Sequence, residues 1–151
     1  MFKQAIARHP GRGRRAPGRP ALLHRRAGPH QPGRGPGAGA ILERHGYTWT
    51  PVEVGAGLHL KSSVTWAGED RLILAEAFRH RAEFAGFHAI PVDPGEACAA
   101  NSLWINGHLL VSAGHPRLRA RLEALGLLVH ELDTSEISKM DGGLTCLSLR
   151  F

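Results

Sequence analysis

Two side chains in this sequence have types that could carry out nucleophilic chemistry. Cys146 follows the turn sequence Asp141-Gly142-Gly143, and a cysteine thiolate is a strong nucleophile when a neighbouring base takes its proton. His59, in the segment LHLKSS, could be that base, because histidine exchanges protons near neutral pH. The plainer alternatives are a small buried cysteine in a strand and one histidine among ten. The residue types alone leave these alternatives open.

Three further residues near these candidates carry weaker signals. Lys61, two residues after His59, is expected either to be solvated or to contact the residues that form the site without touching the substrate. Asn101, at the start of a strand-like segment, either closes a turn or lines the site. Cys98 has no visible base partner, so we expect it to pack as a small apolar side chain. No cysteines or histidines have the paired spacing of a zinc site, so no metal is expected.

A pattern that occurs twice would position these residues. Each copy is strand–strand–helix–strand over about 40 residues, with glycine-containing turns between the elements. The first copy predicts strands at 60–66, 71–75 and 87–92 and a helix at 76–84. The second predicts strands at 102–105, 108–112 and 127–132 and a helix that begins at Pro116 and ends at Gly126. One copy cannot bury its sheet face alone, so we expect the copies to pack together.

Further elements are expected on both sides of the repeat. Residues 40–45 are typical of a helix that ends at Gly46, and residues 48–54 alternate as a strand does. After the second copy, a helix is expected to start at 133–136. The turn after that helix leads into a final strand at 144–151, which would carry Cys146.

The basic charge of the chain is concentrated in one segment. The net charge is +6, and nine of the 19 lysine and arginine residues lie in residues 1–40, which hold no acid. Residues 10–39 consist mainly of Gly, Pro, Arg, Ala and His, and such a composition cannot offset the entropy of ordering. We therefore expect this segment to be disordered. It lacks the aromatic residues that stack on bases, so nucleic acid is not the expected partner.

Length and composition exclude several classes of protein. A chain of 151 residues, of which 42% are hydrophobic, suits one domain with a modest core. No window reaches the roughly 18 apolar residues of a membrane span, and no signal peptide is visible, so no membrane partner is expected. Two cysteines cannot build a disulfide-rich secreted scaffold, which favours a cytoplasmic location.

Four stretches together resemble a known family. They are MFKQAIAR (1–8), LHLKSSVT (58–65), AANSLWING (99–107) and SEISKMDGGLTCLSLRF (135–151). In these stretches the chain is similar to the bacterial dimethylarginine dimethylaminohydrolases of the guanidine-modifying pentein superfamily. The last stretch is the most specific, because an acid, a lysine, the double-glycine turn and the cysteine recur in it together.

The resemblance implies a fold. The family has a five-bladed α/β propeller with pseudo-symmetric ββαβ units, and this chain would carry about two and a half of those blades. The expected organisation is a remnant of the first strand at 1–9, the basic disordered segment at 10–39, and a partial propeller domain at 40–151.

The resemblance also implies a chemistry. Cys146 would attack the guanidinium carbon of an Nω-methylated arginine, and His59 would protonate the methylamine that leaves. His59 would then activate water to release citrulline from a thiouronium on the sulfur. The main-chain carbonyl of Met140 would bind the substrate. The reaction requires no cofactor and no metal.

The chain departs from the family in its first half. The carboxylates that hold the guanidinium, the acid that orients the histidine and the arginines that bind the amino-acid end belong to the missing blades. Neither Glu43 nor Glu53 is assigned to those roles. A guanidinium needs paired acceptors to be held at reacting distance, so activity is expected to be reduced by many orders of magnitude.

The composition of residues 10–39 suggests a cause for this departure. A GC-rich gene translated out of frame tends to encode Arg, Gly, Pro, Ala and His. Our hypothesis is that the reading frame is lost near His9 and recovered near Gly37, with most of the first half deleted. The alternative is an internal deletion with a substituted linker. Resequencing the coding DNA separates the two.

Other functions stay open beside hydrolysis of dimethylarginine. Arginine deiminases and amidinotransferases use a similar cysteine and histidine, but the AAN and DGG motifs favour dimethylarginine. A fragment without activity is a second alternative; it would associate with a copy of itself through open blade edges. A basic adaptor for nucleic acid is the third. Citrulline release from dimethylarginine distinguishes the enzyme from the last two.

Overall fold

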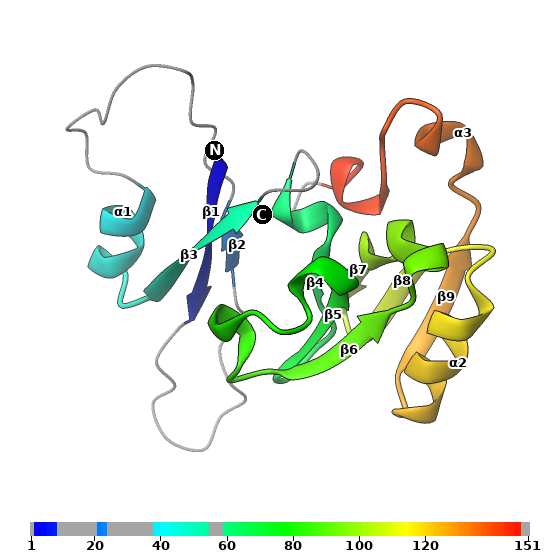
Figure 1. Cartoon of the computed structure of the whole chain (residues 1–151), viewed down its shortest axis with the longest axis horizontal. Helices are drawn as coiled ribbons and strands as arrows, with labels where there is room; N and C mark the ends of the chain where they lie inside the picture. The colour runs from blue at the N-terminus through cyan, green and yellow to red at the C-terminus, as the bar shows by residue number, and fades with distance from the viewer. Residues whose placement is uncertain (1, 9–20, 24–37, 55–58, 149–151) are drawn as a thin grey trace. The chain divides into compact units, whose positions relative to one another are not determined.

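The computed structural model describes residues 2–8, 21–23, 38–54 and 59–148 (Figure 1). The chain divides into two compact units, residues 1–60 and 61–151. No helix in the described ranges is long and apolar enough to span a membrane.

The first unit is an antiparallel sheet with one short helix. Its elements are β1 (Phe2–Arg8), β2 (Ala21–Leu23), α1 (Ala38–Arg44) and β3 (Thr48–Val54). The strands lie in the order β2-β1-β3, and all of β1 pairs with β3. A strand lies within residues 1–9, where the first strand was expected, and the expected strand at 48–54 is confirmed. The helix that ends before Gly46 is confirmed too, since Gly46 has a φ of 77° and donates its N–H to the Glu43 carbonyl at 3.0 Å.

Part of the basic segment belongs to this sheet. Ala21–Leu23 pair with β1, so the expectation of disorder for 10–39 is wrong at these three residues. They include the only two leucines of the segment, and pairing with an existing strand satisfies their backbone groups. Residues 9–20 and 24–37 lie outside the described part of the chain.

The second unit contains one three-stranded arrangement twice. The first sheet has β4 (Val64–Trp66), β5 (Arg71–Ala75) and β6 (His88–Val92), and the second has β7 (Leu103–Ile105), β8 (His108–Ser112) and β9 (Leu128–Leu132). In each sheet the first two strands are antiparallel and the last two are parallel. The repeated order and pairing of strands expected from the sequence are therefore confirmed. Parallel pairing requires a crossover connection, which helix α2 (Pro116–Ala124) supplies in the second copy.

The crossover of the first copy is not the expected helix at 76–84. It consists of two 3₁₀ turns, η2 (Glu76–Phe78) and η3 (Ala82–Phe84). Phe78 and Phe84 are both buried and meet edge to face, with ring centroids 6.2 Å apart. Residues six apart on an α-helix point in directions roughly 120° apart, so a continuous helix would separate the two rings. Burial of both rings favours the broken crossover.

Both copies contribute to one hydrophobic core. It includes Ile73, Ile90 and Val92 from the first copy and Leu109, Val111, Leu118 and Leu122 from the second. Leu118 and Leu122 lie one helical turn apart on α2, as the apolar stripe of that helix predicts. The two copies therefore support each other, as expected for units that cannot bury their sheet faces alone.

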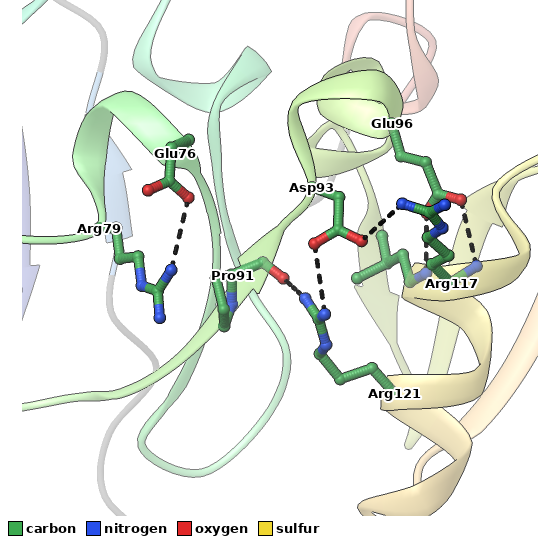
Figure 2. A network of polar contacts seen from close by, with 8 residues as sticks. Glu76, Arg79, Pro91, Asp93, Glu96, Arg117 and Arg121 are labelled. Atoms are coloured by element: carbon green, nitrogen blue, oxygen red, sulfur yellow. Dashed lines mark hydrogen bonds and ion pairs between the residues drawn. The ribbon is translucent and has the colours of Figure 1, made fainter.

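A buried carboxylate ties the connection between the two copies to helix α2. Glu96 lies in the 3₁₀ segment η4 (Pro94–Ala100), and its two oxygens accept the backbone N–H groups of Arg117 and Leu118 at 3.1 and 2.8 Å. Figure 2 shows the carboxylate directed at the first turn of α2. His115, which precedes the helix, makes no side-chain capping bond. Glu96 therefore satisfies donors that a local cap would otherwise serve.

We expect replacement of Glu96 by alanine to lower the free energy of unfolding by about 2 kcal/mol, because two N–H groups of the helix lose their acceptor. Urea unfolding followed by circular dichroism measures the change. Glu96→Gln keeps one acceptor oxygen and is expected to lose less. An unchanged unfolding midpoint in Glu96→Ala would contradict this role.

Candidate active site

Cys146 lies at the end of a short 3₁₀ helix, η5 (Leu144–Cys146). Its N–H donates to the Gly143 carbonyl at 2.9 Å, and its side chain is exposed. The expected strand at 144–151 is therefore wrong over its described part, residues 144–148. The N–H of Cys146 finds its acceptor within the turn, so it needs no partner in a neighbouring strand.

The double-glycine turn before Cys146 is confirmed and is tightly packed. It follows helix α3 (Ser135–Ser138), and Asp141 adopts a left-handed φ of 54°. The Ile137 carbonyl accepts the N–H groups of Met140 and Gly142, at 3.0 and 3.1 Å. A Cβ atom at position 142 would collide with the Ile137 side chain. Glycine is required there because of this close approach.

Charges near α3 are exposed. Lys139 Nζ lies 2.7 Å from Glu136 Oε1, but both side chains are largely exposed, so the pair contributes little to stability. Asp133 accepts the N–H of Ser135 at 2.9 Å, and this bond, helped by the Ser135 side chain, holds the pKa of Asp133 below its usual range. The helix start expected at 133–136 is confirmed by this Asp133 bond.

A buried asparagine from the second copy holds the residue before Cys146. Asn101 Oδ1 accepts the N–H of Thr145 at 3.1 Å and its hydroxyl at 2.8 Å. Asn101 is 8% exposed, and a Cβ atom at position 143 would collide with its amide group. Gly143 therefore lets the chain approach Asn101 closely enough for both bonds. Asn101 therefore supports the segment that carries Cys146, and its role in lining the site stays a prediction.

Asn101 is itself held on both sides. The buried Thr65 hydroxyl donates to the Ala100 carbonyl at 2.7 Å and accepts the N–H of Ser102 at 3.3 Å. The Asn101 N–H donates to the Cys98 carbonyl at 3.1 Å. Strand β4 of the first copy thus fixes the backbone that presents the Asn101 side chain.

Lys61 also contacts the Cys146 segment. Its Nζ donates to the Thr145 carbonyl at 3.3 Å, which places a positive charge beside the backbone that leads into the thiol. Of the two roles left open for Lys61, this contact favours support of the site. Lys61 lies in the 3₁₀ turn η1 (Leu60–Ser62), so the expected strand at 60–66 is wrong in its first half and correct only at Val64–Trp66.

His59 and Met140 are the two remaining candidates. His59 is half-buried and belongs to the first unit, whereas Cys146 belongs to the second, so their pairing stays a prediction. Met140 follows α3, and its side chain is 80% exposed. A contact through its main-chain carbonyl does not use that side chain.

The expectation that Cys98 lacks a base partner is wrong. Cys98 Sγ lies 3.4 Å from His115 Nε2, and Cys98 is exposed rather than packed in the core. The two residues are 17 positions apart, and the fold of the second unit brings them together.

We expect Asn101→Ala to lower the free energy of unfolding by about 1–3 kcal/mol, because the N–H and hydroxyl of Thr145 both lose their acceptor. Urea unfolding measures the loss. Asn101→Asp keeps an acceptor oxygen and is the matched control. Equal stability of the alanine variant and the parent chain would show that these two hydrogen bonds do not stabilise the fold.

The chain is similar to known proteins in sequence and in structure. No family model matches the chain. The curated dimethylarginine dimethylaminohydrolase of Pseudomonas aeruginosa is 41% identical over 112 residues, which are 74% of this chain and 44% of that protein. An uncharacterized protein of Aeropyrum pernix is 36% identical over 96 residues, which are 62% of this chain and 36% of that protein.

Solved structures of similar proteins have the same fold. A cysteine-to-serine mutant of the Pseudomonas aeruginosa enzyme, complexed with citrulline, superimposes with a TM-score of 0.71 at 40% identity. A dimethylarginine dimethylaminohydrolase with a histidine-to-glycine change, solved as an adduct with S-methyl-L-thiocitrulline, gives the same score and identity. Each match covers 75% of this chain and 44% of the other.

The chain thus spans less than half the length of the relatives it matches. The repeated strand arrangement and the α/β propeller fold expected from the sequence are confirmed, and the helix of the repeat is present in the second copy. This chain is a partial dimethylarginine dimethylaminohydrolase-like chain, with the fold of part of a pentein propeller.

Proposed function

We propose that Cys146 and His59 are the nucleophile and the acid–base residue of a site that hydrolyses Nω-methylated arginine to citrulline. The single observation that carries this proposal is the match to dimethylarginine dimethylaminohydrolase over 74% of the chain. The exposed thiol of Cys146, on a turn fixed by Asn101 and Lys61, supports it.

The proposed reaction has two covalent steps. The Cys146 thiolate attacks the guanidinium carbon and forms a tetrahedral adduct. His59 donates a proton to the methylated nitrogen, which leaves as methylamine or dimethylamine. The thiouronium left on the sulfur is then attacked by water, from which His59 takes a proton, and citrulline leaves as the thiolate re-forms.

The changed residues of the relatives support this pair. One similar structure carries a substituted cysteine and the other a substituted histidine, which are the two residue types proposed here for the nucleophile and the acid–base residue. The structure with the substituted cysteine contains citrulline, which is the product of the proposed reaction. Those facts belong to the relatives, and the proposal extends them to this chain.

The substrate would be held in part by this chain. We propose that the main-chain carbonyl of Met140 accepts a hydrogen bond from the substrate, just before the turn that Asp141 begins. By the family resemblance, the carboxylates that hold a guanidinium would belong to the blades that this chain lacks, and the chain covers 44% of the Pseudomonas aeruginosa relative. Loss of paired acceptors removes much of the positioning on which the rate depends.

A citrulline assay beside the full-length Pseudomonas aeruginosa relative tests this proposal. With dimethylarginine as substrate, we expect the chain to form citrulline at a rate at least about a thousandfold below that of the relative, because positioning is incomplete. Dimethylamine should appear in equal amount. No citrulline above the protein-free control, at any substrate concentration, would contradict the proposed function.

A further inference from the structure

A second thiol–imidazole contact lies outside the proposed active site. Cys98 is in η4, and His115 immediately precedes α2; the distance from Cys98 Sγ to His115 Nε2 is 3.4 Å. Sulfur accepts or donates hydrogen bonds at this distance, so the imidazole is in position to hold the proton of the thiol. Cys98 is exposed, so a small molecule in solution can reach it.

The backbone on both sides of this pair is held firmly. Two residues before Cys98, Glu96 is buried and binds the N–H groups of Arg117 and Leu118 in the first turn of α2 (Figure 2). The Cys98 carbonyl accepts the N–H of Asn101. These bonds tie η4 to the helix that His115 precedes, so the contact between thiol and imidazole is set by the fold.

The side chain of His115 does not cap helix α2, although it stands at the capping position. It stands before the first residue of α2, where a polar side chain often caps the helix, yet it makes no such bond. Glu96 serves those helix donors instead, and the imidazole contacts the sulfur. The first turn of α2 holds Arg117 and no acid, and Glu96 is the carboxylate that binds its N–H groups.

We propose that Cys98 and His115 form a second reactive thiol site, which undergoes exchange with low-molecular-weight disulfides such as oxidised glutathione. His115 Nε2 takes the proton of Cys98, and the thiolate attacks one sulfur of the disulfide. A new bond forms between Cys98 and that sulfur as the disulfide bond breaks. The released thiolate takes up a proton, so the mixed disulfide and one small thiol are the products.

The proposal is independent of the catalytic role of Cys146. None of the contacts that support it involve Cys146 or His59. A free cysteine is only a few per cent thiolate at neutral pH, so a base in contact raises its reactivity by about tenfold or more. Cys98 should therefore react faster than an isolated thiol.

The test measures thiol exchange in the full chain. In a Cys146→Ser background, Cys98 is the only thiol, and 5,5′-dithiobis(2-nitrobenzoate) reports exchange by the coloured thiolate it releases. At pH 7 we expect His115→Ala to slow the reaction by about tenfold, and added imidazole to restore part of the rate. His80→Ala, which removes another exposed histidine of the same unit, is the matched control and should keep the rate.

Circular dichroism checks that each variant is folded, and His115→Gln provides a second variant that preserves side-chain size. Incubation with oxidised glutathione, followed by peptide mass spectrometry, should place one glutathione on Cys98. An unchanged rate in folded His115→Ala and His115→Gln would overturn the proposal. An equal loss in His80→Ala would overturn it as well.

Discussion

Replacement of Cys146 by serine is expected to abolish citrulline formation from dimethylarginine, a loss of at least about a thousandfold. A serine hydroxyl is far less acidic than a thiol, and an imidazole alone does not make it attack a guanidinium carbon. The Cys146 side chain is exposed, so the substitution leaves the contacts of Asn101 and Lys61 with Thr145 in place. The loss would therefore report chemistry and not misfolding.

The other cysteine provides the matched control for this prediction. Cys98→Ser removes an exposed thiol from the same unit, and we expect it to leave citrulline formation unchanged. Circular dichroism should show that both variants fold. Citrulline formation that survives in Cys146→Ser would refute the assignment of the nucleophile.

Replacement of His59 by glycine is expected to separate the two halves of the reaction. S-methyl-L-thiocitrulline carries a methylthio group. This group leaves as methanethiolate, which does not need a proton from histidine. Cys146 can therefore still attack it and release methanethiol. Hydrolysis of the resulting thiouronium needs a base to activate water, and loss of that base slows the step by about 10²–10⁴-fold. We expect one equivalent of methanethiol per chain, after which release nearly stops.

Continued release of methanethiol by His59→Gly would contradict this role, because the second step would then proceed without the histidine. His80→Gly is the matched control and should turn over as the parent chain does. A relative with a histidine-to-glycine change was solved as an adduct with this same compound, which makes it a suitable probe.

Local signals in the sequence were enough to predict most of the strands. Asn106-Gly107 predicts a two-residue hairpin, and both residues have the left-handed φ that such a turn needs, 49° and 85°. Residues 48–54 and 71–75 are strands with the predicted bounds. In each case the turn residues or the alternation of side chains lie within a few positions of the element they define.

Elements that depend on distant contacts were predicted wrongly. The segment 76–84 has the composition of a helix, but burial of both Phe78 and Phe84 breaks it into two turns. The segment around Cys146 looks apolar enough for a strand, yet bonds from the distant Asn101 and Lys61 hold its backbone in a turn. The composition of a short stretch of sequence does not indicate which distant residues will contact it.

The candidate site shows the same division. Cys146 and the DGG turn could be found from the sequence, because an unusual motif marks them. The support from Asn101 to Thr145 spans 44 positions, and the contact of Cys98 with His115 spans 17, so neither could be seen before the fold was known. In the structure, the close approach of the buried Asn101 to Gly143 reveals the contact between Asn101 and Thr145.

The most direct test of the proposed nucleophile is peptide mass spectrometry of His59→Gly after incubation with S-methyl-L-thiocitrulline. The proposed mechanism predicts one covalent adduct per chain, located on the peptide that contains Cys146 and absent when Cys146 is also changed to serine. An unmodified Cys146 peptide, or an adduct found on Cys98 instead, would contradict it.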